Sequence, residues 1–168
     1  MSSRPTGRTR KPKNPKSCHE RALGLLAVRP RSRREIETRL LQAGFGRDEV
    51  DEVLASLERA GLIDDTQFAL DLAEHAFNNK GSGVRAVASA LRAKGVDVST
   101  VEAVTAGFAD DEEERARELA ERRATRMRGL DRATAYRRLT DFLIRRGHSP
   151  STARDAAARA LAVEAEFD

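Results

Sequence analysis

The amino-acid sequence predicts an all-α protein built from three tandem three-helix repeats, with nine helices in total. The composition favours helices, because the chain is 35% charged, only 4% aromatic and without Trp. No segment alternates apolar and polar residues as a half-buried strand would, whereas apolar residues recur at helical spacing between glycine-centred turns. A length of 168 residues is sufficient for several small helical units.

The repeat is visible when Gly44, Gly95 and Gly147, which are 51 and 52 residues apart, are set in register. Apolar side chains then share four positions, eight and four residues before each glycine and six and nine residues after it. In this order the positions hold Ile36, Val87 and Leu139; Leu40, Leu91 and Leu143; Val50, Val101 and Ala153; Val53, Val104 and Ala156. We therefore expect three units of about 50 residues that stack and share one core.

Residues 1–16 form the first segment, which we expect to be a disordered basic tail. It carries six basic residues, three prolines and no acid, and it has almost no apolar surface to bury. Two interpretations remain open: attraction to phosphate by counterion release, or a solubilising extension. Because the tail holds six of the 31 basic residues, residues 17–168 have a net charge of −2, which favours a protein partner with DNA as a secondary contact.

The first repeat is expected at residues 17–63. A short helix ends before Pro30, and Ser32 with Glu35 gives a capping box that opens the next helix, which stops at Gly44. Between these two helices lies a basic stretch formed by Arg29, Arg31, Arg33 and Arg34. These arginines either clamp phosphates or carboxylates of a partner, or pair with nearby glutamates such as Glu35 and Glu37.

The second repeat is expected at residues 64–109. Asp64 or Asp65 caps its first helix, and Ser99 with Glu102 reads as a capping box for its third. The segment Gly81-Ser82-Gly83 lacks the flanking residues of a phosphate-binding loop and is interpreted as a turn. The second helix of this repeat, between that turn and Gly95, carries the basic residues Arg85, Arg92 and Lys94.

The third repeat is expected at residues 110–168. Five acidic residues, 110–114, open its first helix, and Arg122, Arg123, Arg126 and Arg128 close it, as the helix dipole favours. Asp131 caps the second helix, whose basic side chains are Arg137, Arg138, Arg145 and Arg146. Ser149-Pro150 reads as an N-cap followed by proline at the first helical position of an Ala-rich last helix.

No group of residues suggests catalysis, so we do not expect an enzyme. The single cysteine, Cys18, and the three histidines show neither a nucleophile motif nor metal-ligand spacing, and we expect no metal and no cofactor. No apolar run approaches a membrane span, and the basic N-terminus has no apolar segment behind it. We therefore expect a cytoplasmic protein with no membrane contact.

Three stretches resemble the RecX family, the bacterial regulators of RecA recombinase. They are SRREIETRLLQAGF, LERAGLIDDTQFA and GSGVRAVASALRAKGV, and the middle one is the most specific, because helical patterning does not require a Gly-Leu-Ile-Asp-Asp junction between two units. The resemblance covers about residues 20–108.

The resemblance implies an elongated, curved, solenoid-like body that lies in the groove of the RecA–DNA filament across neighbouring subunits. Such a protein suppresses the DNA-dependent ATPase, co-protease and strand-exchange activities of RecA without catalysis of its own, in DNA repair, homologous recombination and the SOS response. We expect a monomer. The predicted contacts to RecA or to single- or double-stranded DNA are the basic residues Arg29, Arg31, Arg33, Arg34, Arg85, Arg92, Lys94, Arg137, Arg138, Arg145 and Arg146.

Two alternatives belong to other classes of protein. A helix-turn-helix DNA-binding regulator also has a glycine turn between its second and third helices. The third helix of the first repeat argues against it, because five acidic residues against two arginines would be repelled by a major groove. The other alternative is a helical scaffold for an unrelated protein partner.

Overall fold

The structure, a computed structural model, describes residues 16–165, and side chains as far as residue 162. Within this range it contains nine α-helices and no strand, which confirms the predicted all-α fold. The helices are α1 (Cys18–Leu26), α2 (Arg33–Gln42), α3 (Arg47–Arg59), α4 (Asp65–Glu74), α5 (Val84–Ala93), α6 (Val98–Ala106), α7 (Glu112–Ala124), α8 (Arg132–Arg145) and α9 (Pro150–Ala165). A π-helical turn, His75–Asn79, extends α4, and a 3-10 turn, Thr125–Met127, follows α7. The predicted tail lies almost entirely outside the described residues.

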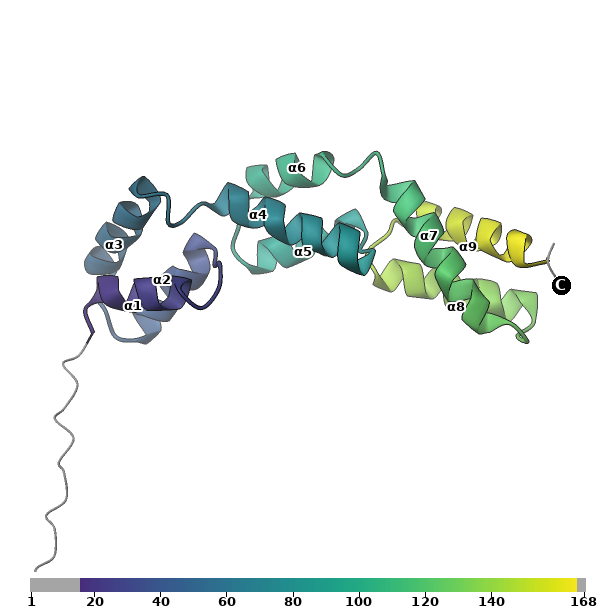
Figure 1. Cartoon of the computed structure of the whole chain (residues 1–168), viewed down its shortest axis with the longest axis horizontal. Helices are drawn as coiled ribbons and strands as arrows, with labels where there is room; N and C mark the ends of the chain where they lie inside the picture. Colours follow the sequence, from purple (N-terminus) through teal and green to yellow (C-terminus); the bar gives the residue numbers. More distant parts are fainter. Residues whose placement is uncertain (1–15, 166–168) are drawn as a thin grey trace, which may run out of the picture.

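Consecutive helices group in threes, and we call α1–α3 unit 1, α4–α6 unit 2 and α7–α9 unit 3. Figure 1 shows the units in a row that bends like a shallow arch, with α1 and α9 at opposite ends. The predicted elongated and curved body of three three-helix repeats is confirmed for this part of the chain.

Side chains cap six of the described helices. Four of these caps, Ser32, Asp64, Asp131 and Ser149, lie where the sequence predicted, whereas the cap at Ser17 was not predicted. Ser17 and Ser32 each accept a hydrogen bond from the backbone N–H of a glutamate three residues later, and that glutamate returns the contact. Asp64, the first of the two candidates in unit 2, caps α4. Ser149 accepts a hydrogen bond from the N–H of Thr152 at 3.1 Å, as expected for the N-cap of α9.

The predicted capping box at Ser99 and Glu102 is wrong. Helix α6 begins two residues earlier than predicted, and Asp97 is the N-cap, because its carboxylate accepts from the N–H of Ser99 at 2.8 Å and from the Ser99 hydroxyl at 2.6 Å. Asp and Ser are equally good N-caps, so the sequence alone offered two start points, two residues apart.

The prediction of one shared core is also wrong. The buried apolar side chains form three separate clusters, one inside each unit. Leu54 in unit 1, Leu91 in unit 2 and Leu143 in unit 3 are all fully buried, but none belongs to another unit's cluster. The units are therefore small domains in series, and what joins them must come from other contacts.

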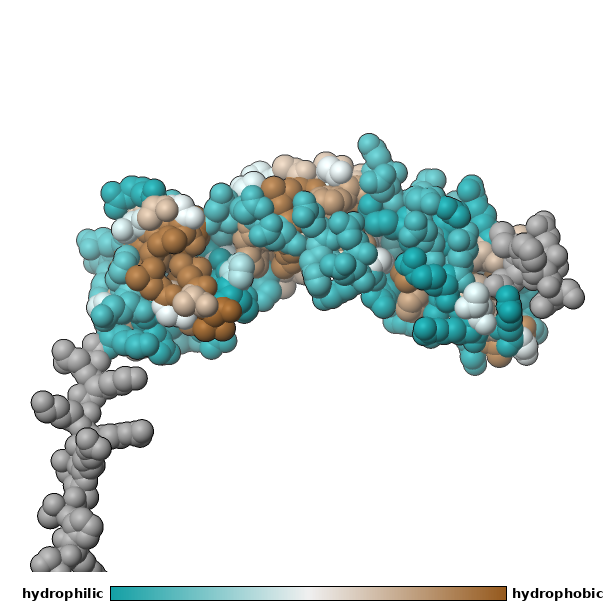
Figure 2. Space-filling model, viewed as in Figure 1, coloured by the Kyte–Doolittle hydropathy of each residue, from teal (hydrophilic) through white to brown (hydrophobic). Residues whose placement is uncertain are grey.

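Apolar side chains also reach the surface of unit 1. Figure 2 shows a hydrophobic area over α1, whereas the visible face of unit 3 is largely hydrophilic. Two exposed apolar residues lie in this part of the chain, Leu23 in α1 and Val28 just after its end. No helix among the described residues is long and apolar enough to cross a membrane.

Candidate partner interface

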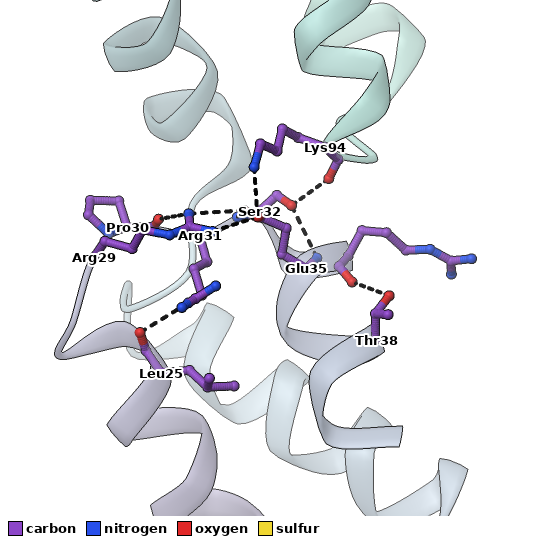
Figure 3. A network of polar contacts seen from close by, with 9 residues as sticks. Leu25, Arg29, Pro30, Arg31, Ser32, Glu35, Thr38 and Lys94 are labelled. Carbon is purple, nitrogen blue, oxygen red and sulfur yellow. Dashed lines mark hydrogen bonds and ion pairs between the residues drawn. The ribbon is translucent and has the colours of Figure 1, made fainter. Parts of the chain in front are cut away.

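The joint between units 1 and 2 is polar. It forms where the first turn of α2 meets the last turn of α5, in the network that Figure 3 draws. The Ser32 hydroxyl, which is completely buried, donates to the carbonyl of Lys94 at 2.5 Å. The Lys94 ammonium reaches back to the Glu35 carboxylate at 2.9 Å, and Arg29 donates to the same carboxylate at 2.8 Å. One carboxylate thus holds two cations, one of them from the next unit.

Burial alone would raise the pKa of Glu35. Hydrogen bonds from Arg29, Lys94 and the backbone N–H of Ser32 outweigh this effect and lower the pKa from 4.5 to about 2. Because the pKa is lower in the folded state, Glu35 stabilises the protein above about pH 4.5 and loses this contribution as the pH falls toward 2.

Replacing Glu35 with glutamine is expected to reduce the free energy of unfolding by about 1–2 kcal/mol near pH 7, a value discounted for partial solvent screening. Glutamine keeps the capping box but removes the charge that holds both cations. The variant should therefore lose less stability than the wild type between pH 5 and pH 3. Denaturant unfolding at several pH values measures the free energy of unfolding of both proteins. The control is Glu52→Gln, at an exposed position of α3. Identical pH profiles of wild type and Glu35→Gln would contradict the assigned role.

The joint between units 2 and 3 repeats this geometry. The N–H of Gly83, at the N-cap of α5, donates to the carbonyl of Arg146 at 2.8 Å, and the N–H of Arg85 donates to the carbonyl of Gly147 at 3.1 Å. The Arg146 guanidinium reaches back across the joint to the carbonyl of Lys80 at 3.0 Å. In both joints the basic residue at the end of a unit's second helix, Lys94 or Arg146, donates a hydrogen bond to the preceding unit.

The two joints use the same positions of the repeat. Ser32 and Gly83 each lie twelve residues before their unit's register glycine, and each meets the residue before the register glycine of the next unit. In unit 3 the equivalent position is Ala135, which lies inside the longer helix α8 and is 3% exposed. Ala135 belongs to the core of unit 3, so this position does not form a polar joint of the kind made by Ser32 and Gly83.

Additional contacts fix the second joint. Arg115 of α7 donates to the carbonyl of Phe108, and its guanidinium lies 4.5 Å above the Phe77 ring of unit 2. Burial lowers the pKa of Arg115. His148, completely buried, donates from Nε2 to the carbonyl of Gly81 at 3.2 Å, and burial lowers its pKa. The turn Gly81-Ser82-Gly83 is thus part of the joint, a role that its sequence did not reveal.

The four arginines of the predicted basic stretch, two before α2 and two in its first turn, all have partners inside unit 1. Arg29 pairs with Glu35, Arg34 with Glu37 at 2.9 Å, and Arg33 with Glu58 at 2.9 Å. Arg31 donates to the carbonyl of Leu25 in α1 at 3.1 Å, as Figure 3 shows. The interpretation that these arginines pair within the protein is therefore the one that the structure supports. Their contact with the phosphates or carboxylates of a partner stays a prediction.

The other predicted contact residues divide into two groups. Lys94 and Arg146 are engaged in the two joints. The remaining five are exposed and form no ion pair with another described residue; they are Arg85, Arg92, Arg137, Arg138 and Arg145. These five side chains of units 2 and 3 are available to a partner.

In unit 3 the structure gathers predicted and unpredicted arginines into one depression. A cavity of about 420 Å³ opens between the end of α7 and the face of α8, and four arginines and a single carboxylate line it, together with Met127, Leu130 and Phe142. A second cavity of about 220 Å³ shares part of this lining. We call the combined surface the basic groove, formed by Arg122, Arg123, Arg126, Arg138, Arg145 and Arg146 around Phe142.

From the sequence, the helix dipole explained why Arg122, Arg123 and Arg126 follow one another at the end of a helix. That explanation did not predict their place in this groove. Their spacing along α7 gave the signal, because residues three and four apart lie on one helical face. The facing helix α8 supplies the rest. Among the described residues no group of His, Cys, Asp or Glu could hold a metal ion.

Comparison with known families matches the three units separately. The family models for the first, second and third three-helix domains of RecX match residues 18–57, 64–104 and 110–157.

Full-length relatives show the same similarity. The chain is 37% identical over 145 residues to the regulatory protein RecX of Streptomyces coelicolor, which covers 86% of this chain and 77% of that protein. It is 35% identical over 162 residues to the regulatory protein RecX of Mycobacterium ulcerans, which covers 95% of this chain and 94% of that protein. The crystal structure of RecX from Lactobacillus salivarius superposes with a TM-score of 0.77 at 22% identity, over 85% of this chain and 94% of that one.

Proposed function

This chain belongs to the RecX family of regulatory proteins, and on this premise we propose that it regulates the RecA recombinase by occupying the RecA–single-stranded DNA filament. Its action is inhibition of the ATPase, co-protease and strand-exchange activities of RecA in the cytoplasm, in DNA repair, homologous recombination and the SOS response. It carries out no catalysis itself, and a monomer suffices.

The observation that carries this proposal is the elongated, curved row of three units (Figure 1). A row of separate domains offers a long surface to a repeating partner, because each unit can meet an equivalent site on the next filament subunit. The polar joints hold the units at fixed spacing, so that contacts made by one unit favour contacts made by the next.

The exposed arginines provide charge complementarity along this row. Arg85 and Arg92 project from α5 in unit 2, and Arg137, Arg138 and Arg145 from α8 in unit 3, without internal ion pairs among the described residues. Guanidinium groups bind carboxylates and phosphates in the same bidentate manner, so they suit acidic filament surface as well as DNA.

The helix-turn-helix alternative receives no support from unit 1. The acidic residues of its third helix, Asp48, Glu49, Asp51, Glu52 and Glu58, are all exposed. A helix with this surface would be repelled by the phosphates that flank a major groove. Site-specific duplex binding that survives removal of residues 1–16 would favour this alternative over the filament proposal.

Hydrolysis of ATP by the cognate RecA on single-stranded DNA tests the proposal. Addition of the chain at amounts well below RecA is expected to lower the hydrolysis rate progressively, because one bound chain affects several subunits. An unrelated ATPase that depends on single-stranded DNA serves as the control and should keep its rate. An unchanged RecA rate, or equal inhibition of both enzymes, would exclude regulation through the filament.

A further inference from the structure

The basic groove of unit 3 is an unusual concentration of positive charge. Four guanidinium groups, from Arg123, Arg126, Arg138 and Arg145, line the larger cavity with only one carboxylate, Asp141. By contrast, Arg29, Arg33 and Arg34 near the start of α2 and Arg117 within α7 pair with glutamates, as does Arg122 at the edge of the groove. Like charges at this spacing repel, so the arrangement is costly without an anion to bind.

The ring of Phe142 orients two of the arginines of the groove. The guanidinium of Arg123 lies 5.0 Å from the centre of the Phe142 ring, and that of Arg146 lies 5.4 Å from it. The Nε of Arg123 is buried without a hydrogen-bond partner among the described residues. Phe142 thus orients two of the cations of the groove. Arg146 also donates to the carbonyl of Lys80, whereas Arg123 is oriented by the ring without such a contact.

The chemistry of the lining selects among anionic partners. Arginine clusters bind acidic or phosphorylated peptides as well as nucleic acids. Here the guanidinium groups stand on two facing walls over a small apolar floor of Met127, Leu130 and Phe142, which favours a continuous strand over a short acidic motif. Closely spaced guanidinium forks on two walls match successive phosphates of one strand, and their flat faces offer stacking surfaces for bases. A cavity of about 420 Å³ between two helices has room for unpaired nucleotides but is too small to enclose a duplex.

We infer that the basic groove binds the phosphate backbone of a single-stranded nucleic acid without sequence preference, with Arg126 and Arg138 as the central contacts from its two walls. The inference deepens the proposed function by naming a nucleic-acid contact on unit 3. The binding needs no recombinase, so it can be tested separately from regulation of RecA. The groove adjoins the joint between units 2 and 3, since Arg146 belongs to both.

Fluorescence anisotropy of a labelled oligo-dT with the full chain and no RecA tests this inference. The double variant Arg126→Glu, Arg138→Glu should lose affinity about 10- to 100-fold and reduce the salt dependence of binding by a slope of about 1–2, because about 0.7 is expected for each lost phosphate contact on a single strand. The matched control, Arg21→Glu with Arg154→Glu, changes the net charge equally at two exposed positions outside the groove. It should keep its affinity within about twofold. The basic tail is present in every variant and contributes equally.

Each alternative outcome decides against the inference. Equal losses in the groove variant and the control would mean that general electrostatics, and not the groove, binds the strand. Equally tight, groove-dependent binding of a duplex would show that the site does not select single strands. Unchanged oligo-dT binding with weakened RecA inhibition would show that the groove contacts protein. Circular dichroism and the melting temperature of Arg126→Gln, Arg138→Gln, which should show the same loss of binding with an unchanged fold, exclude misfolding as the cause.

Discussion

Replacing Gly83 with alanine is expected to open the joint between units 2 and 3 while each unit stays folded. Gly83 has φ −82°, which any residue adopts, so the substitution causes no backbone strain. A Cβ at this position would, however, lie 2.3 Å from the carbonyl carbon and oxygen of Gly147 and from the N of His148. Backbone atoms cannot move aside as a flexible side chain can, so the two units must separate, at a cost of about 1–3 kcal/mol.

The measurement is small-angle X-ray scattering of the full chain, in which the largest dimension and the shape of the profile should change. Gly46→Ala is the matched control, because Gly46 is also a helix N-cap, has φ −67° and has nothing within 4 Å of its Cβ position. A scattering profile of Gly83→Ala that coincides with those of Gly46→Ala and the wild type would show that the close approach does not hold the units together.

Replacing Leu54 with alanine is expected to destabilise unit 1 by about 2–5 kcal/mol, as large-to-small substitutions in well-packed cores do. Leu54 is fully buried in the core of unit 1, which shares no buried residue with the cores of units 2 and 3. Hydrogen exchange should therefore show lost protection in α1–α3, with a smaller change in unit 2 through the joint and none in unit 3.

The reciprocal variant, Leu143→Ala, serves as the control for this pattern. Leu143 is fully buried in unit 3, and its replacement should leave unit 1 protected. Loss of protection throughout the chain in either variant would mean that the three units fold as one cooperative body, contrary to the separation of their cores.

Local chemistry explains why so much of the fold could be predicted. Helical periodicity and glycine turns identified the repeat. Four predicted capping residues, Ser32, Asp64, Asp131 and Ser149, were correct because N-cap side chains act on their own first turn. The error at Ser99 has the same origin, since Asp97 offers an equally good cap two residues earlier. The error about the shared core has another origin: periodicity shows which side of a helix is apolar but not which helix covers it.

The joints and the basic groove could not be predicted in this way. The contact of Gly83 with Arg146 connects residues 63 positions apart, and polar joints leave no period in the sequence. Arg123 at the end of α7 fits the helix dipole perfectly well, and only the packing of α8 against α7 brings Arg138 and Arg145 beside it. Lys94 is a further example. The sequence predicted that it contacts a partner, but in the structure its ammonium group pairs with Glu35 of unit 1.

Under the proposed function, the spacing of the units governs how the chain contacts the filament. Three small cores supply the stability of the units, and the two polar joints set the curve of the row. Residues of the joints are therefore expected to affect filament binding without touching the partner. The exposed arginines of units 2 and 3 are expected to affect it directly.

Cosedimentation with RecA–single-stranded DNA filaments, held by a non-hydrolysable ATP analogue, tests the central claim most directly. The account predicts that the chain sediments with the filament, saturates at fewer than one chain per RecA subunit, and leaves RecA on the DNA. It also predicts that Gly83→Ala binds more weakly than Gly46→Ala. A chain that stays in the supernatant, or that binds equally well with the joint opened, would contradict the account.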